Sequence, residues 1–384
     1  MRPPRSRRIV LGATLLAITA CDPFAPAPTG SGATNPSGQM ELILRTEPGD
    51  FFRLHRLSTD GVRVFTGSED NTVLAIDATT GQVVWRVAGV GDDLLGETTA
   101  GGDRVYTAGQ SARAWQAATG ELLWKTELNA SARLHLGYVA DDVYFIGTDT
   151  VVYALDGATG AVRWRTGIGA DWAYDGRVRS ISGAGDVLYV CASEPLTANG
   201  WKTRGHIIAL DRATGAIRWR HVMSYENTFS FCLGEPTVAG DVVVVGDAGG
   251  NNFVAVDRET GAFRWRHAGD PEWVGPYTSP VASGDTLFAA SNDRRILALD
   301  RATGGVLWQM ETGGSAWHVT PCGKVLLASD MSVWVLDPRT GRVLTRDVQL
   351  QYGRGDLVSS RFLVHGGYAF AVGNRRFYKW RCPS

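Results

Sequence analysis

Residues Leu210–Trp219 read Leu-Asp-Arg-Ala-Thr-Gly-Ala-Ile-Arg-Trp, and copies of this segment recur along the 384-residue chain. Each copy contains an apolar strand, an Asp-x-x-Thr-Gly turn and a second strand with Trp four residues after the Gly. One such hairpin cannot bury its apolar face alone, so the copies are expected to stack. The other copies are Asp77–Trp85, Asp156–Trp164, Asp257–Trp265 and Asp300–Trp308, with variants at Gln116–Trp124 and Asp337–Gly341.

Each part of the repeat has a structural role in the hairpin or in its packing. The Asp ends a strand and accepts a hydrogen bond from a backbone N–H of the following turn. The Gly adopts the positive φ that the turn needs. A Trp side chain is large and flat, which suits the wedge between packed sheets, so we interpret these residues as core. These structural docking residues are Trp85, Trp124, Trp164, Trp219, Trp265 and Trp308.

Residues 1–39 are not expected to belong to the fold. Four arginines precede the apolar run Ile9–Ala20, which is too short to span a membrane and is typical of an export signal. The small residues before Cys21 resemble a lipobox, in which this cysteine becomes the lipidated N-terminus; the alternative is an ordinary signal with a chance cysteine. We therefore predict a signal peptide over 1–20. Residues 21–39 are rich in Pro, Gly, Ser, Ala and Thr and are predicted to be a flexible tether.

The composition fits an exported globular protein and gives no indication of nucleic-acid binding. The formal net charge is −1, and residues 1–20 contain four Arg and no acidic residue, so their removal leaves a charge of about −5. Four cysteines remain besides Cys21, an even number that permits two disulfides in an oxidising compartment. Four cysteines allow three connectivities, and their spacing does not choose among them.

A second kind of turn indicates how many structural units the chain contains. Seven repeat hairpins accompany eight tight turns that precede central strands. Met40–Glu47 resembles Gly120–Glu127, an outer strand, and is expected to complete the eighth sheet. We therefore predict an all-β, eight-bladed β-propeller of four-stranded blades over residues 40–384, with the last blade closed by the N-terminal strand. The tight turns are Asp60-Gly61, Gly102-Asp103, Asp141-Asp142, Gly185-Asp186, Gly240-Asp241, Gly284-Asp285, Cys322-Gly323 and Gly366-Gly367.

The repeat, as it stands in Ala209–Trp219 and Ala298–Trp308, resembles the tryptophan-docking repeat of pyrroloquinoline-quinone (PQQ)-type propellers. The resemblance covers residues 40–384. This repeat serves both quinoprotein dehydrogenases and non-catalytic lipoproteins. Among the lipoproteins, the chain resembles in length and layout the family of BamB, the propeller subunit of the outer-membrane barrel-assembly machinery. The fold alone does not choose between these functions.

Several sequence features favour a protein that is not an enzyme. By resemblance, quinoprotein dehydrogenases are longer and often carry adjacent cysteines against the cofactor, whereas this chain has no Cys-Cys pair. We expect no cofactor and no metal; the alternative is a small quinoprotein or ligand-sensing propeller that binds PQQ with calcium. Three His near a channel could hold a metal, but known metal motifs are more tightly spaced. The residues expected on inner strands are His55, Glu97, His135, Arg179, Glu235, His318 and Arg361.

Loop length points to one face of the propeller. In the fourth blade, the connection between the second and third strands is expected to run from Ala192 to His206, longer than in most blades. Exposed aromatic residues with charged neighbours suit a protein or glycan partner. The alternative is that the loops fold over themselves, with the aromatic residues as their own small core. The partner-binding residues predicted on this face are Trp172, Tyr174, Trp201, Lys202, Arg204, Tyr225 and Trp273.

The predicted propeller restricts the cysteine pairing. Cys191 and Cys232 would lie toward the long-loop face on neighbouring blades, and Cys322 and Cys382 toward the opposite face, again on neighbouring blades. A disulfide needs Cα atoms within about 7 Å. We therefore predict the bridges Cys191–Cys232 and Cys322–Cys382; the alternative is four buried free thiols.

These observations predict a non-catalytic envelope lipoprotein that acts as a protein-interaction scaffold, BamB-like in outer-membrane protein assembly. The expected partners are an envelope protein such as a barrel-assembly subunit, and the membrane through the lipid anchor. The propeller is expected to be monomeric, to face the periplasm and to be anchored at the inner or outer membrane. By resemblance to enterobacterial lipoproteins, Asp22 favours the inner membrane.

The first prediction concerns the anchor. Replacing Cys21→Ser removes the acceptor of the lipid, so the variant should move from the membrane fraction to the periplasmic fraction while its melting temperature stays unchanged. Cell fractionation followed by a salt wash measures this. A variant that stays with washed membranes would show that lipidation at this cysteine is not the anchor.

Overall fold

Strands pair four at a time into eight separate antiparallel sheets. The chain separates into Met1–Asn35 and Pro36–Ser384. The expected signal peptide, Cys21 and the tether over 21–39 lie outside the described residues. The computed structural model describes residues 40–47, 56–68, 71–88, 98–109, 111–128, 135–141, 143–147, 149–198, 200, 202–223, 230, 232–249, 251–270, 272, 275, 280–330, 332–347, 361–373 and 376–384.

Each sheet is one blade, numbered here in chain order. Blades 1 and 2 consist of β2 (Ser58–Thr59), β3 (Arg63–Ser68), β4 (Thr72–Asp77), β5 (Val83–Val87), β6 (Thr98–Gly101), β7 (Arg104–Ala108), β8 (Ser111–Gln116) and β9 (Leu122–Glu127). Blades 3 and 4 consist of β10 (His135–Ala140), β11 (Val143–Gly147), β12 (Val151–Asp156), β13 (Val162–Gly167), β14 (Arg177–Ala184), β15 (Val187–Pro195), β16 (Thr203–Asp211) and β17 (Ile217–Met223).

The second half of the ring repeats this order, except in its last blade. Blades 5 and 6 consist of β18 (Cys232–Ala239), β19 (Val242–Asp247), β20 (Asn252–Asp257), β21 (Phe263–Ala268), β22 (Val281–Ser283), β23 (Thr286–Ser291), β24 (Arg295–Asp300) and β25 (Val306–Glu311). Blades 7 and 8 consist of β26 (His318–Cys322), β27 (Val325–Ser329), β28 (Val333–Leu336), β29 (Val343–Asp347), β30 (Leu363–His365), β31 (Tyr368–Val372), β32 (Phe377–Arg381) and β1 (Glu41–Thr46).

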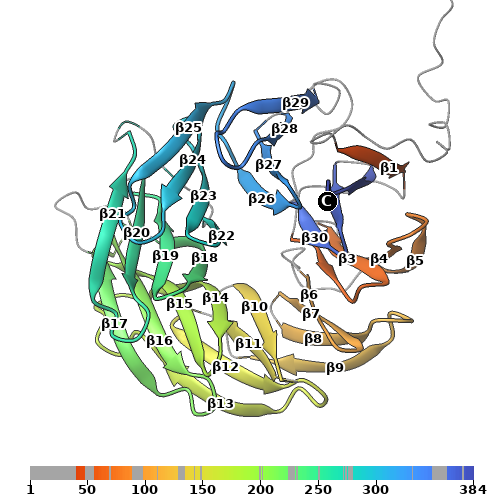
Figure 1. Cartoon of the computed structure of the whole chain (residues 1–384). Coiled ribbons are helices and arrows are strands. Elements are labelled where there is room, and N and C mark those ends of the chain that lie inside the picture. Colours follow the sequence, from red (N-terminus) through yellow and green to blue (C-terminus); the bar gives the residue numbers. More distant parts are fainter. Residues whose placement is uncertain are drawn as a thin grey trace, which may run out of the picture. The chain divides into compact units, whose positions relative to one another are not determined.

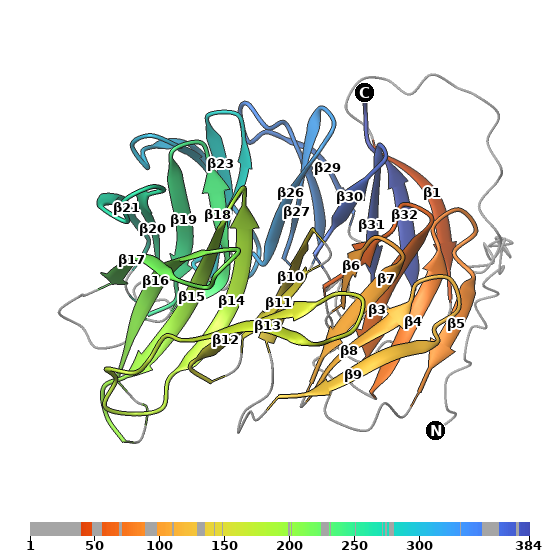
Figure 2. The same cartoon turned by 90° about the horizontal axis from the view of Figure 1, so that it is seen from below.

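The first strand of the chain closes the ring. β1 pairs antiparallel with β32, with Glu41 opposite Arg381 and Thr46 opposite Phe377. Figure 1 shows β1, in red, beside the blue C-terminal strands, and the sheets set around a central opening. Figure 2 shows the same blades from the side. The predicted eight-bladed β-propeller, with its last blade completed by the N-terminal strand, is confirmed.

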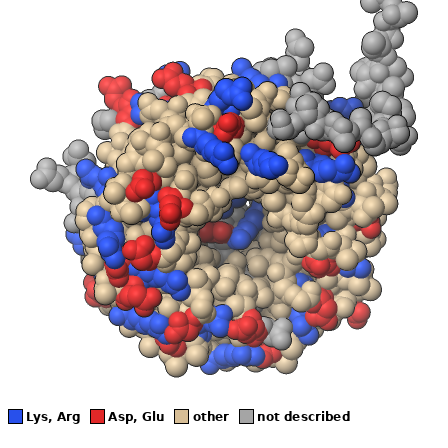
Figure 3. Space-filling model, viewed as in Figure 1, with Lys and Arg blue, Asp and Glu red and all other residues tan. Residues whose placement is uncertain are grey.

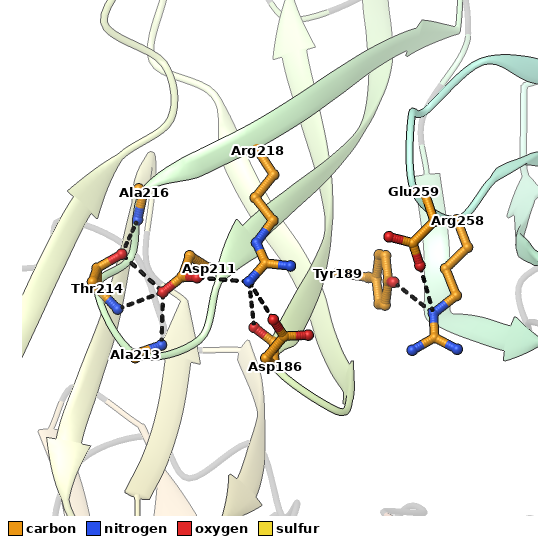
Figure 4. A network of polar contacts seen from close by, with 9 residues as sticks. All are labelled: Asp186, Tyr189, Asp211, Ala213, Thr214, Ala216, Arg218, Arg258 and Glu259. Atoms are coloured by element: carbon orange, nitrogen blue, oxygen red, sulfur yellow. Dashed lines mark hydrogen bonds and ion pairs between the residues drawn. The ribbon is translucent and has the colours of Figure 1, made fainter.

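Where a repeat carries the Asp, this residue holds its own turn, as Figure 4 shows for blade 4. In blade 4, Asp211 Oδ1 accepts hydrogen bonds from the N–H groups of Ala213 (3.1 Å) and Thr214 (2.9 Å) and from the Thr214 hydroxyl (2.9 Å). The Gly215 N–H donates to the Asp211 carbonyl at 2.8 Å, and Gly215 has a φ of 75°. The hydrogen bond from Arg218 to Oδ2 lowers the pKa of Asp211 to about 2. The turn is therefore held by the Asp and Thr side chains of the repeat.

The docking tryptophans join each blade to the next. Trp219 Nε1 donates to the carbonyl of Arg258 at 3.1 Å, and its ring covers Gly261. A Cβ at Gly261 would lie 2.5 Å from the ring, so this glycine is needed for space as well as for its φ of 72°. The six tryptophans therefore pack between blades, as expected of core residues. The equivalent contacts are Trp85–Gly120, Trp124–Gly160, Trp164–Gly215, Trp265–Gly304 and Trp308–Gly341.

Two joints of the ring use other contacts. β1 has Leu44 at the position of the docking Trp, and Leu44 and Thr46 together cover Gly81 of blade 1. The Thr46 hydroxyl donates to the Gly81 carbonyl at 2.9 Å. Blade 8 has no Asp-x-x-Thr-Gly turn, because its outer strand comes from the start of the chain. Thr345, which replaces the Trp in blade 7, therefore has no such turn to cover.

Two disulfides link neighbouring blades. Cys191 in β15 is bonded to Cys232 in β18 across blades 4 and 5, with a Cα–Cα distance of 5.5 Å. Cys322 in β26 is bonded to Cys382, just after β32, across blades 7 and 8, with a Cα–Cα distance of 5.1 Å. These are the two pairs that were predicted from the positions of the four cysteines in the propeller. The second bridge spans one of the two joints that lack a docking Trp.

Arginines that follow the turn Asp add polar links between blades 3 to 6, which the sequence analysis did not anticipate. Arg212 of blade 4 donates to Asp141 in the tight turn of blade 3. Arg258 of blade 5 donates to the Tyr189 hydroxyl of blade 4 at 3.2 Å (Figure 4). Arg301 of blade 6 lies 3.7 Å from Asp241 of blade 5. Ion pairs this exposed contribute about 0–1 kcal/mol each, so they supplement the apolar clusters between blades.

The long connection predicted over Ala192–His206 is wrong in its bounds. β15 and β16 remain paired as far as Pro195 and Thr203, so only residues 196–202 connect them. The added strand length contains Glu194 and His206, whose side chains are buried and hydrogen-bonded at 2.8 Å. Buried polar residues hide the alternating pattern by which a strand is recognised in sequence. No helix among the described residues has the length and apolarity to cross a membrane.

Ring closure by β1 leads to the second prediction. Deleting residues through Glu47 exposes an edge of β32 and uncovers Gly81, so it should lower the melting temperature by about 5 °C or more and cause aggregation. Deleting residues through Gln39 leaves these contacts in place and is the matched control. Scanning calorimetry and light scattering compare the two. Equal melting temperatures would contradict closure by β1.

Candidate functional site: the channel and the loop face of blade 4

The first strand of each blade faces the central channel. Figure 3 looks into this channel and shows charged side chains of both signs in the opening. Glu235 of β18, in blade 5, is hydrogen-bonded to Arg56, which precedes β2 of blade 1. Blades 1 and 5 are opposite in a ring of eight, so this ion pair crosses the channel. Arg361, which precedes β30 of blade 8, approaches the second carboxylate oxygen of Glu235 to 3.8 Å.

A cavity of about 260 Å³ lies beside these arginines. His318, at the start of β26, contributes to its wall, and its Nδ1 is buried without a hydrogen-bond partner among the described residues. Burial and the charge of Arg361 lower the pKa of His318 to about 3, so this imidazole is neutral at physiological pH. The lining residues are Arg56, Leu57, Val281, His318, Val319, Thr320, Arg361, Phe362, Leu363 and Val364.

Several residues were expected on inner strands, and most of those within the described part of the chain do lie there. Arg179 and Glu235 lie on the inner strands β14 and β18, and His318 begins β26. His135 begins β10, but its side chain, together with His55 and Glu97, lies outside the described residues. Arg56 was missed, although it is the direct neighbour of the predicted His55. Among the described residues, no three His, Cys, Asp or Glu side chains are grouped to hold a metal ion.

The loop face of blade 4 is built around Trp172. This side chain is half-buried, covers Gly176 and lies with its ring centroid 4.9 Å from that of His206. Trp172 also packs against the apolar cluster that blades 3 and 4 share, so its ring rests on the core of the propeller. Tyr174, by contrast, is 41% exposed. Gly176 lies close to the Ser193 carbonyl and Trp172 lies against His206, so the loop that enters blade 4 contacts the paired ends of β15 and β16.

Charged residues fix the two strand ends beneath this loop. Glu194 accepts hydrogen bonds from His206 at 2.8 Å and from Arg204 at 3.4 Å. Burial holds the pKa of His206 below its ordinary value in spite of the nearby carboxylate. Arg220 reaches back to Asp171, at the start of the loop, at 3.1 Å. These contacts fix the loop on the sheet.

Only part of the predicted partner-binding set can be placed. Lys202 is exposed, and Arg204 is half-buried against Glu194. Trp201, Tyr225 and Trp273 lie outside the described residues. The placed residues Trp172, Tyr174, Lys202 and Arg204 all belong to blade 4 or to the loop that leads into it. Glu194 and His206, which organise this face, were not among the predicted site residues, because buried polar residues give no periodic signal.

The low pKa of His318 leads to the third prediction. Below pH 6.5 the unfolded chain binds a proton at this histidine, whereas the folded protein does not until about pH 3. The free energy of unfolding should therefore fall as the pH is lowered through this window, by about 1 kcal/mol per pH unit from this residue. His318→Gln should show a shallower decline in urea unfolding at pH 6.5, 5.5 and 4.5. Parallel pH profiles would contradict a His318 imidazole that stays neutral in the folded protein.

Comparison with known proteins assigns the chain to a family. The sequence model of the family described as outer membrane protein assembly factor BamB matches residues 69–228 and 203–382. The BamB protein of Moranella endobia (strain PCIT) is 25% identical over 280 residues, which cover 68% of each chain. A tetrathionate hydrolase of Acidithiobacillus ferrooxidans is 27% identical over 288 residues, which cover 73% of this chain and 52% of the hydrolase.

Solved structures match the same propeller. BamB from Moraxella catarrhalis superposes with a TM-score of 0.65 at 16% identity, covering 88% of this chain and 98% of that one. The quinohemoprotein alcohol dehydrogenase from Comamonas testosteroni superposes with a TM-score of 0.68 at 13% identity, covering 90% and 76%. At these identities the superpositions show the fold alone. With the family match spanning most of the ring, the chain belongs to the outer membrane protein assembly factor BamB family of PQQ-like β-propellers.

Proposed function

We propose that this protein is a non-catalytic, lipid-anchored scaffold in the assembly of outer-membrane proteins. The observation that carries the proposal is the BamB family match, which runs through both halves of the propeller from residue 69 to 382. Two BamB relatives, from Moranella endobia and Yersinia pestis, support it at 25% and 22% identity. Cys21 holds the lipid that keeps the propeller at the membrane, facing the periplasm, and the tether over 21–39 gives it reach.

The proposed partner surface is the loop face of blade 4. Tyr174 supplies an exposed aromatic ring there, and Lys202 an exposed cation. The packing of Trp172 on His206 and the ion pair between Arg220 and Asp171 hold the loop in one conformation, which lowers the entropy cost of binding. An aromatic side chain on a preorganised loop is the usual anchor of a protein interface. The partner is a barrel-assembly subunit, bound by a monomeric propeller.

The propeller is proposed to work without PQQ and calcium. Calcium takes six to eight oxygen ligands, mainly carboxylates. The described residues that line the central cavity include no carboxylate, and Glu235, on the opposite side, is paired with Arg56 and Arg361. Two guanidinium groups at this position repel a divalent cation. These residues therefore do not fit the metal on which the quinone alternative depends.

An enzyme remains the second candidate, because the tetrathionate hydrolase relative is 27% identical over 73% of this chain. The two functions differ in what they require of the molecule. A scaffold needs the loop face of blade 4, whereas an enzyme of this fold needs the channel. Of the channel residues that the structure describes, the group beside the cavity consists of two arginines, one paired glutamate and a neutral histidine. This set lacks a free carboxylate to act as a general base.

The fourth prediction tests the partner surface. The double substitution Tyr174→Ala and Lys202→Glu removes the aromatic anchor and reverses the charge of an exposed side chain of blade 4, so recovery of a barrel-assembly subunit from native membranes should fall about tenfold. The control is Leu307→Ala, on the outer strand of blade 6, where the side chain is 56% exposed. Quantitative mass spectrometry of affinity-purified complexes measures the recovery.

Three results would speak against this proposal. Wild-type protein that recovers no barrel-assembly subunit would argue against the scaffold itself. Equal loss in the double variant and in Leu307→Ala would place the interface elsewhere. Dehydrogenase activity that appears when quinone and calcium are added would favour the enzyme.

A further inference from the structure

The channel carries an excess of positive charge at one place. Arg56 and Arg361 bring two guanidinium groups to the single carboxylate of Glu235, one to each oxygen. His318, beside Arg361, adds no charge at physiological pH. The group of Arg56, Arg361, Glu235 and His318 therefore carries a net charge of +1. A single negative charge from a ligand would balance it.

The walls of the adjoining cavity are mainly apolar. Side chains from blades 6, 7 and 8 provide them, including Val281, Val319 and Val364. The two arginines and His318 are the ionisable groups of this lining, and Thr320 contributes a hydroxyl. At about 260 Å³, the cavity is far larger than the space that one water molecule needs. An apolar pocket with a few convergent polar groups is the usual form of a small-molecule site.

We propose that this cavity binds a small organic monocarboxylate. The carboxylate of the ligand lies against the guanidinium groups of Arg56 and Arg361, which retain N–H donors beyond those directed at Glu235. The apolar part of the ligand packs against the valines. His318 Nδ1, which is buried and has no partner among the described residues, supplies a further polar contact. This proposal concerns the channel and does not depend on the partner surface of blade 4.

The role of Glu235 follows from the same geometry. Its carboxylate holds both arginines in place across the channel and competes with a ligand for their N–H groups. Its negative charge also repels an anion in the cavity. Removing that charge while keeping the shape of the side chain should therefore strengthen anion binding, whereas a merely structural ion pair would give no such gain.

Calorimetric titration of the full mature protein with benzoate tests this proposal, with benzamide as the neutral ligand of the same shape. Benzoate should bind and benzamide should bind at least tenfold more weakly, because only the acid carries the charge. Arg361→Gln should weaken benzoate binding about tenfold, and Glu235→Gln should strengthen it several-fold. Arg381→Gln, which removes an arginine paired with Glu41 on the outer edge of blade 8, should leave binding unchanged.

Several outcomes would overturn the carboxylate site. Equal binding of benzoate and benzamide would show an apolar pocket without charge recognition. Binding of inorganic phosphate without benzoate would show that the apolar walls take no part, and binding of PQQ without benzoate would indicate a quinone site. Weaker benzoate binding by Glu235→Gln, at an unchanged melting temperature, would contradict the competing role of that carboxylate.

Discussion

Most neighbouring blades of the propeller are held together by a contact between a tryptophan side chain and a glycine of the next blade. The indole ring occupies the space that the Cβ atom of any other residue would need, as Trp219 does over Gly261. The tryptophan and the glycine must therefore occur together. The same glycine adopts the positive φ that closes its own hairpin, which couples the geometry inside a blade to the spacing between blades. Because each ring also donates a hydrogen bond to the neighbouring turn, the polar indole nitrogen is satisfied where it is buried.

The ring is closed by contacts that replace this one. Blade 8 takes its outer strand from β1, so it has no turn on which blade 7 could dock, and the Cys322–Cys382 bridge lies at that joint. At the other side of blade 8, Leu44 of β1 takes the place of the tryptophan over Gly81. Each blade is a separate sheet, so the circle is continuous only through the contacts between blades, and these two joints determine whether it is stable. The second disulfide, Cys191–Cys232, instead braces the blades beside the long loops.

Two places in the molecule lie outside the contacts of the repeat. The channel collects the inner-strand residues, where Arg56 and Glu235 come from opposite blades and meet only because the ring is closed. The loop face of blade 4 is fixed by a buried Glu194–His206 pair and by the packing of Trp172. The residues of these two places are not among the Trp–Gly contacts that join the blades, so the fold by itself does not determine what they do.

The sequence by itself determined the repeated architecture, because each repeat carries its own local rules. The Asp and Gly of Asp211–Gly215 specify a hairpin without reference to the rest of the chain, and the likeness of Met40–Glu47 to an outer strand specifies where the ring closes. The order of the blades also placed two cysteines toward each face of the propeller, and this placement predicted the two disulfides that the structure shows. Only the tertiary structure brought Arg56 to Glu235, extended β15 and β16 through a buried polar pair, and turned Trp172 inward. These features depend on contacts between residues far apart in the chain, which leave no periodic pattern in the sequence.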